Sequence, residues 1–120
     1  MAGFPPQRKG ILYLAEGGQE TEIMYRHGHQ LPEFAMYPLL DNPVAVADLK
    51  EMYRRMLDVA AEHRFVPMMS GLDYRASPDW GDKLGYSRSA LADALDASIT
   101  LLRDVAKPYE DQIDEILIGG

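Results

Sequence analysis

The sequence predicts an α/β fold in which about three parallel strands are joined by long crossover helices. Three short apolar runs, at residues 11–15, 65–69 and 115–119, are the predicted strands. Between these runs, apolar residues recur at the spacing of amphipathic helices. This alternation of strand and helix favours parallel pairing, with each helix forming a right-handed crossover.

The first strand is the apolar run ILYLA, which ends at Glu16 and the glycine pair Gly17 and Gly18. A short apolar run without alternation is typical of a strand that is buried on both faces. A short helix is expected over about 19–26, with Gly28 as its stop signal. The residues that follow, HQLPEFAMYPLLDNP, predict an irregular connection.

Two long helices are predicted from their capping residues and apolar faces. The first begins with Asp41 or Asn42 as N-cap and Pro43 in its first turn. Its predicted buried face contains Leu49, Met52, Tyr53, Met56, Val59 and Ala60. Ser87 is the predicted N-cap of the second, which should end near Pro108. Its apolar face is marked by Leu91, Ala94, Leu95, Ser98, Leu102 and Val105.

The second strand, FVPMM, contains Pro67, which removes one donor from a sheet ladder. The stretch after it is rich in Gly, Pro, Ser and Asp, and predicts a long loop over 70–86. The third strand, within EILIGG, ends on two glycines at 119–120. Functional groups of parallel sheets collect at the carboxyl ends of the strands. We therefore expect Glu16, the 70–86 loop and these glycines to face one shared site.

Composition excludes several classes of function. The chain has 12 Lys and Arg against 19 Asp and Glu, a net charge of -7, and its basic residues are scattered. This balance argues against nucleic acid or an anionic membrane as the partner. The sequence has neither an apolar membrane span nor a signal peptide at its start, so a cytoplasmic location is expected. With no cysteine, these residues offer no disulfide, thiol nucleophile or thiolate metal site.

The 120 residues are expected to form one domain without a second. The last predicted strand has no following helix to cover it, which would leave a sheet edge and an apolar face open. We therefore predict the amino-terminal part of a (β/α)8 TIM barrel, a fragment that self-associates through its open faces. The alternative is a stand-alone, non-catalytic βαβαβ module, flavodoxin-like in outline, that binds a small anion or a partner through its glycine ends.

Three blocks resemble the homocysteine S-methyltransferase family of zinc-dependent (β/α)8 barrels. The first is Glu16, Gly17 and Gly18, followed by Thr21 in an amphipathic helix. The second, LPEFAMYPLLDNPVAV, is similar to the family's LP, F and LL pattern before a helix that begins NPEAV. The third, RASPDWGDKLGYS, is almost identical to RASPDWGAKLGYS of one bacterial branch. This thirteen-residue block is the most specific of the three.

The resemblance implies transfer of a methyl group to homocysteine, giving methionine as in methionine biosynthesis, and leaves the methyl donor open. A thiol with a pKa of about 8.5 is mostly protonated at neutral pH. Zinc stabilises the thiolate, which attacks the methyl group of a sulfonium, ammonium or folate donor. In this family three cysteines from later strands hold the zinc. These residues contain no cysteine, so we expect the chain alone to lack catalytic zinc and to be inactive.

The resemblance also implies a homocysteine pocket formed partly by this chain. Glu16 would accept a hydrogen bond from the ligand ammonium, and Gly17 and Gly18 would let backbone donors approach the ligand. The alternative for Glu16 is a solvated acid in a turn. Thr21 would donate to the ligand carboxylate, with an ordinary capping hydroxyl as the alternative.

After the second strand, the related branch carries ETPTWRA where this chain has SGLDYRA. Ser70 and Asp73 are therefore the polar candidates at the pocket mouth, with a solvated loop acid as the alternative for Asp73. Trp80 is expected either to wall the pocket or to anchor the loop on the barrel rim. His27 and His29 are not expected to bind a metal, because imidazoles two positions apart diverge on a helix and no third ligand is expected nearby.

Overall fold

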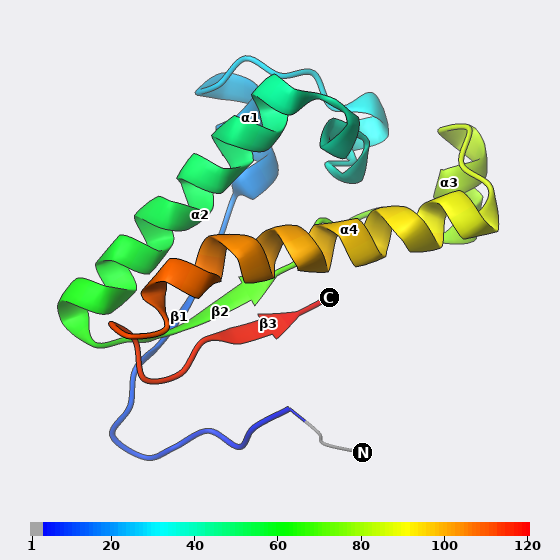
Figure 1. The fold of residues 1–120 in the computed structure, drawn as a ribbon. Coiled ribbons are helices and arrows are strands. Elements are labelled where there is room, and N and C mark those ends of the chain that lie inside the picture. The colour runs from blue at the N-terminus through cyan, green and yellow to red at the C-terminus, as the bar shows by residue number, and fades with distance from the viewer. Residues whose placement is uncertain (1–3) are drawn as a thin grey trace.

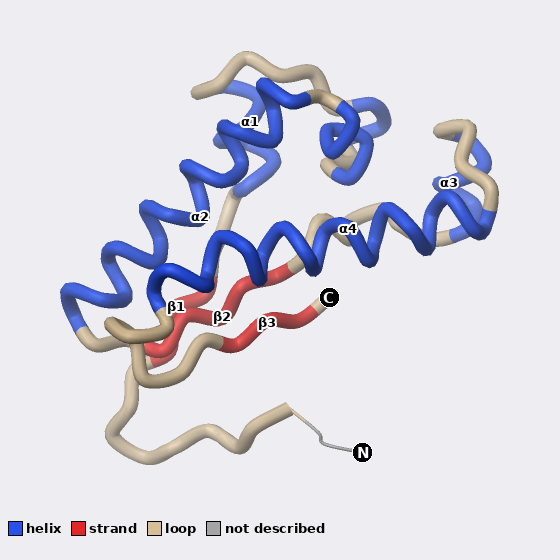
Figure 2. Tube along the Cα trace, in the orientation of Figure 1, coloured by secondary structure: helices blue, strands red, loops and turns tan. Residues whose placement is uncertain are grey.

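The computed structural model describes residues 4–120, in which three strands form one parallel sheet in the order β1, β2, β3 (Figures 1 and 2). The strands are β1 (Tyr13–Ala15), β2 (Val66–Ser70) and β3 (Leu117–Gly119). Tyr13 is paired with Val66, and Ser70 with Gly119. The predicted α/β class and the parallel pairing of the three strands are therefore confirmed.

The strand bounds differ from the predicted ones in all three strands: β1 and β3 begin two residues later than predicted, at Tyr13 and Leu117, and β2 is shifted by one residue to Val66–Ser70. Leu12 lies outside β1 and is 67% exposed, so the strand is shorter than its apolar run. Ser70 is the last residue of β2, although it was predicted to begin the loop. Pro67 is tolerated in this central strand because its nitrogen is directed to the β3 side. The N–H of Val66 donates to Leu12 on the other side, and pairing with β3 begins only at Met68.

Two long α-helices connect the strands, and a short α-helix precedes each of these long helices in the chain. The α-helices are α1 (Gln19–Tyr25), α2 (Pro43–His63), α3 (Pro78–Lys83) and α4 (Arg88–Ala106), and the 3-10 helices are η1 (Pro32–Phe34), η2 (Tyr37–Asp41) and η3 (Lys107–Tyr109). Asn42 caps α2 by accepting hydrogen bonds from the N–H groups of Val44 and Ala45. Ser87 caps α4 by accepting from Ala90. Both predicted long helices are confirmed.

Some local predictions were wrong. The connection after α1 contains η1 and η2 instead of irregular backbone throughout, and the predicted long loop contains α3. The side of α2 that faces the core includes Leu57, whereas Val59 is 42% exposed. Apolar spacing left the rotation of α2 ambiguous, and packing against its neighbours decided it.

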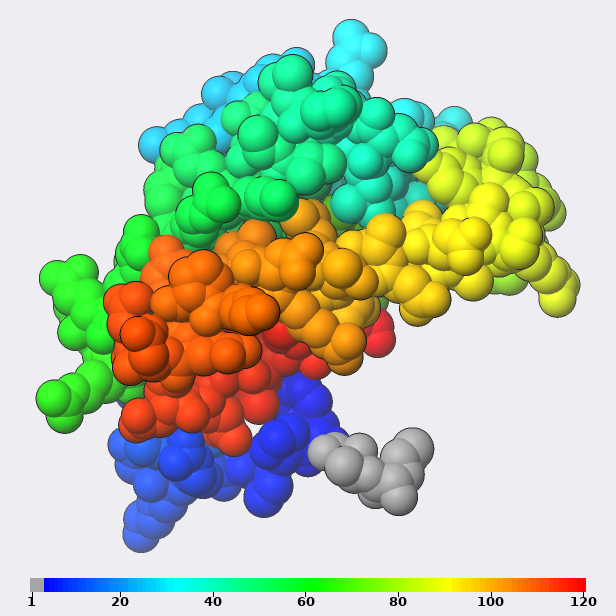
Figure 3. All heavy atoms as spheres, viewed as in Figure 1, coloured from blue at the N-terminus to red at the C-terminus, as the bar shows by residue number. Residues whose placement is uncertain are grey.

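Both crossover helices, α2 and α4, lie on the same face of the sheet (Figures 1 and 2). Their atoms adjoin each other in Figure 3, where the blue N-terminal segment lies below β3. A flavodoxin-like sheet has the strand order 2-1-3-4-5, in which the first strand lies between the second and the third and the first two crossover helices cover opposite faces. The flavodoxin-like outline is therefore wrong for this chain. A sequential order with helices on one face is compatible with a partial α/β fold.

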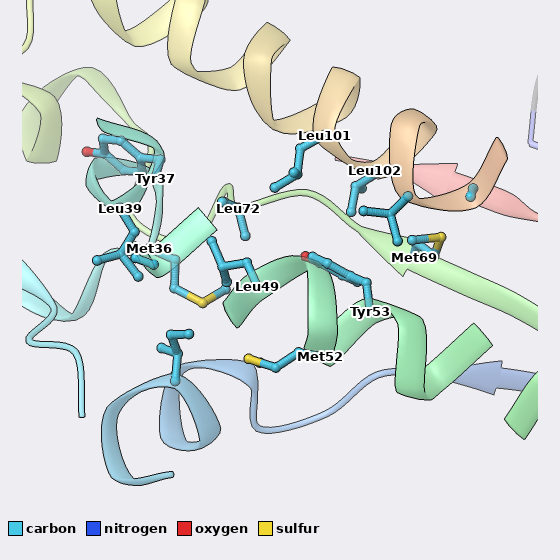
Figure 4. Packing of buried hydrophobic residues seen from close by; sticks show 14 of the residues in the cluster. Met36, Tyr37, Leu39, Leu49, Met52, Tyr53, Met69, Leu72, Leu101 and Leu102 are labelled. Carbon is cyan, nitrogen blue, oxygen red and sulfur yellow. The ribbon is translucent and has the colours of Figure 1, made fainter. Parts of the chain in front are cut away.

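The core lies between this helical layer and the sheet. Leu49 and Tyr53 of α2 belong to one buried cluster with Met69 of β2 and Leu102 of α4, and Leu49 lies beside Leu72 (Figure 4). Further buried side chains come from the connection before α2, namely Met36, Tyr37 and Leu39. This packing supports the carboxyl ends of the strands from one side. Within residues 4–120, no helix has the length and apolar character needed to cross a membrane.

Candidate functional site

The carboxyl ends of the three strands meet at one edge of the sheet and are joined by hydrogen bonds. Glu16 directly follows β1, and its Oε1 accepts a hydrogen bond from the backbone N–H of Ser70 at the end of β2. The N–H of Gly71 donates to the carbonyl oxygen of Gly119 in β3 at 2.8 Å. Because parallel strands end at the same edge, the three strand ends lie together as expected, but Gly119 and Gly120 line other cavities than the one beside Glu16.

A shallow cavity of about 180 Å³ lies at this edge. It is lined by Glu16, Gly17, Gly18, Gln19, Glu20, Ser70, Gly71, Asp73 and Tyr74. Five of the six candidate binding residues are therefore neighbours in the folded chain. The sixth, Thr21, lies exposed on α1 and is not among the lining residues. The capping alternative for Thr21 is wrong, because the N-cap of α1 is Gly18, whose φ of 63° suits glycine.

Glu16 is the most perturbed acid of this edge. Burial of the carboxylate raises its pKa from 4.5 to about 7. The hydrogen bond from the backbone of Ser70 acts in the opposite direction, and the nearby negative charge of Asp73 adds to the rise. Its second oxygen, Oε2, is buried without a hydrogen-bond partner among the described residues. Burying this oxygen without a hydrogen bond destabilises the ionised carboxylate. A ligand group that donated a hydrogen bond to Oε2 would offset that desolvation cost.

Tyr53 also contributes to the candidate site, although the sequence predicted only a place for it in the core. Its hydroxyl group donates to the carbonyl oxygen of Ser70 at 3.0 Å, so α2 holds the end of β2 from the helical side. Burial raises the pKa of Tyr53, and the negative charge of Glu16 adds to this rise. The backbone of Ser70 thus donates to Glu16 and accepts from Tyr53.

Ser98 supports the turn that follows β2. Its hydroxyl oxygen accepts a hydrogen bond from the N–H of Leu72 at 2.6 Å, and the residue is only 1% exposed. A serine on the apolar face of a helix was recognised in the sequence, but its partner lies 26 residues away. Ser98 therefore satisfies a buried backbone donor at the base of the candidate site.

The tryptophan of the RASPDWGDKLGYS block lies away from this cavity. Trp80 on α3 is stacked by two cations, the guanidinium of Arg75 and the ammonium of Lys83, each 4.2 Å from the ring centroid. Arg75 also donates to the carbonyl oxygen of Glu33 at 2.6 Å. Trp80 does not line the cavity beside Glu16. These contacts match the interpretation of Trp80 as a loop anchor.

The two histidines near the end of α1 do not diverge as expected. His27 and His29 both contact Asp48 of α2, and Glu51 lies close to His27. The prediction that no third ligand is near was therefore wrong in three dimensions. Asp48 and Glu51 are distant from the histidines in the sequence, and the packing of the turn on α2 brings them together.

The residues at the carboxyl edge do not match the zinc centre that the family resemblance implies. Zinc held by three thiolates requires cysteine, and the sequence contains none. The edge instead offers carboxylates and the hydroxyl group of Ser70. Comparison of the chain with protein-family models, with curated proteins and with solved structures finds no significant match.

Proposed function

We propose that the carboxyl edge forms one wall of a homocysteine-binding site in a homocysteine S-methyltransferase-like barrel. The observation that carries the proposal is Oε2 of Glu16, a buried acceptor that has no partner among residues 4–120 and lies beside a cavity at the end of a parallel strand. In the proposed complex this oxygen accepts a hydrogen bond from the ammonium group of the amino acid. The sequence resemblance around Glu16, Gly17 and Gly18 supports the same role.

The charge of the cavity favours a cationic group over an anion. Three carboxylates line it, from Glu16, Glu20 and Asp73, and no Lys or Arg is among the lining residues. A small anion at this edge would be repelled by these acids. This argues against the alternative of an anion-binding module that uses the glycines at the strand ends.

The proposed role is orientation of the substrate, not activation of its sulfur. A carboxylate meets an ammonium well, but it is a hard ligand compared with the thiolates that hold zinc in the family. Methyl transfer to the homocysteine thiolate requires those thiolates, which these 120 residues lack. We therefore propose that this chain contributes binding and that, alone, it does not turn over.

Calorimetric titration of the chain with homocysteine tests the proposal. Glu16→Gln keeps an oxygen for the N–H of Ser70 but removes the negative charge. A charge-assisted hydrogen bond contributes about 1.5 to 3 kcal/mol, so affinity should fall by roughly 10-fold to 150-fold. Glu62→Gln, at an exposed position late in α2, is the matched control and should bind as the parent does.

The des-amino analogue 4-sulfanylbutanoate separates the ammonium contact from general binding. It should bind the parent and Glu16→Gln with equal affinity, because it has no ammonium group. The proposal is overturned if the parent chain binds no homocysteine. Equal loss of affinity for homocysteine and for the analogue in Glu16→Gln would also contradict the assigned contact.

A further inference from the structure

A second group of polar side chains lies where the turn after α1 packs on α2. It consists of His27 and His29 from the turn and Asp48 and Glu51 from the helix. None of these residues lines the cavity beside Glu16. The group is therefore separate from the site proposed for homocysteine.

The backbone of the turn explains why the two imidazoles converge. The helix α1 ends at Tyr25, and Gly28 adopts a φ of 77°, which favours glycine. The N–H of Gly28 donates to Met24 at 3.1 Å, and that of His29 to Ile23 at the same distance. The histidines therefore lie on a closed turn that packs against α2, and the divergence expected on a helix does not apply.

Asp48 lies between the two imidazoles. Its Oδ1 is 3.5 Å from Nδ1 of His27, and its Oδ2 is 2.6 Å from Nε2 of His29. Both histidine side chains are only 12% exposed, so they are held against the helix. Glu51 lies three residues further along α2 and is exposed. One ligand atom each from His27, Asp48 and Glu51 lies within 4.8 Å of the other two.

We propose that His27, Asp48 and Glu51 bind one divalent cation of the Zn²⁺ class. An imidazole and two carboxylates are ligands that such ions accept, and the two negative charges balance the charge of the ion. Bond lengths of about 2.1 Å place tetrahedral ligands about 3.4 Å apart. The exposed side chain of Glu51 is free to rotate and close this difference. Such an ion links the turn to α2.

His29 acts as a positioning residue in this site. Its imidazole holds one oxygen of Asp48 by a hydrogen bond at 2.6 Å, which leaves the other oxygen directed toward His27. Outer hydrogen bonds of this kind fix the orientation of metal-ligating groups. Loss of His29 should therefore weaken metal binding less than loss of His27.

Arg55 is the cation that competes with the metal for Glu51. Its Nη2 lies 3.8 Å from Glu51, 3.3 Å from Glu22 and 3.5 Å from Nε2 of His27. When Glu51 turns to the metal, Arg55 keeps its shorter contact with Glu22. Removal of the guanidinium by Arg55→Met should therefore strengthen metal binding.

Titration of the chelator-treated, metal-free chain with Zn²⁺ by calorimetry tests the proposal, with Co²⁺ absorption as a second probe. The parent should bind one equivalent and unfold at a higher temperature when metal is present. His27→Ala and Asp48→Asn should each lose at least tenfold in affinity. His63→Ala is the matched control, because His63 is exposed at the end of α2 and should leave affinity unchanged.

Glu51→Gln keeps the test decisive if a buried variant fails to fold. Glu51 is exposed, and circular dichroism should show the parental fold together with weaker Zn²⁺ binding. The proposal is overturned if the parent binds no Zn²⁺, if folded Glu51→Gln binds it as tightly as the parent, or if His63→Ala loses it. Glu16→Gln should bind Zn²⁺ normally, so failure of the homocysteine proposal is distinguishable from failure of this one.

Discussion

The carboxylate of Glu16 accepts a hydrogen bond from the backbone N–H of Ser70, which ties the residue after β1 to the last residue of β2. The two oxygens of this carboxylate differ in their surroundings. Oε1 is used within the sheet edge, whereas Oε2 is buried without a partner among the described residues. One side chain therefore joins two strands and also offers an acceptor to a ligand.

The pH dependence of folding should reflect this carboxylate. The pKa of Glu16 is raised to about 7 in the folded chain, so between about pH 4.5 and 7 the folded state holds a proton that the unfolded state has released. The stability that this group contributes is fully present below about pH 4.5 and is lost as the pH rises through 7. Urea unfolding of the parent and Glu16→Gln across this range should show a flatter profile for the variant. Parallel profiles would contradict the raised pKa.

Amino-acid binding should strengthen as the pH rises through 7, because the proposed ammonium contact requires ionised Glu16. Methionine is the suitable probe, since its thioether does not titrate. Its affinity for the parent, measured by calorimetry at pH 6 and pH 8, should be higher at pH 8. Glu16→Gln should show no such rise, and an equal rise in both proteins would assign it to another group.

Ser98→Ala should destabilise the fold by about 1 to 3 kcal/mol, because the buried N–H of Leu72 loses its acceptor. Denaturant unfolding monitored by circular dichroism measures the change. Thr100→Ala, at an exposed position on the same helix, serves as the control and should change stability by less than about 0.5 kcal/mol. Similar effects of the two substitutions would show that the hydrogen bond contributes little.

Gly71→Ala should also destabilise the chain, by about 1 to 3 kcal/mol. A Cβ atom at this position would lie 3.0 Å from Oγ of Ser98 and 3.3 Å from Cδ1 of Ile99. Gly17→Ala is the matched glycine control, since a Cβ there meets no atom of the described residues within 4 Å. Thermal unfolding of the two variants should give a lower midpoint for Gly71→Ala only.

The chain should self-associate at high concentration. Both β1 and β3 are edge strands, and Phe4 and Leu12 beside the sheet are exposed. Unpaired strand edges and exposed apolar side chains favour association. Sedimentation velocity over a range of concentrations should show species larger than the monomer. A concentration-independent monomer with a sharp, cooperative thermal transition would favour a stand-alone module.

Much of the fold could be predicted from the sequence because its determinants are local. The apolar runs around Tyr13, Val66 and Leu117 identify the strands, and their separation by long amphipathic segments favours parallel pairing. Asn42 and Ser87 identify the helix starts because each cap acts on residues two or three positions away. The neighbourhood of Glu16, Ser70 and Asp73 also followed from topology, since parallel strands end at one edge.

Tertiary structure alone decided the partners of individual side chains. Tyr53 and Ser98 were recognised as parts of helix faces, but their hydrogen bonds to Ser70 and Leu72 join residues 17 and 26 positions apart. His27 and Asp48 meet because the turn at Gly28 packs on α2. Helical spacing had predicted instead that the imidazoles of His27 and His29 would diverge. Periodicity specifies which elements form, whereas packing sets their rotation and docking and so determines which polar groups meet.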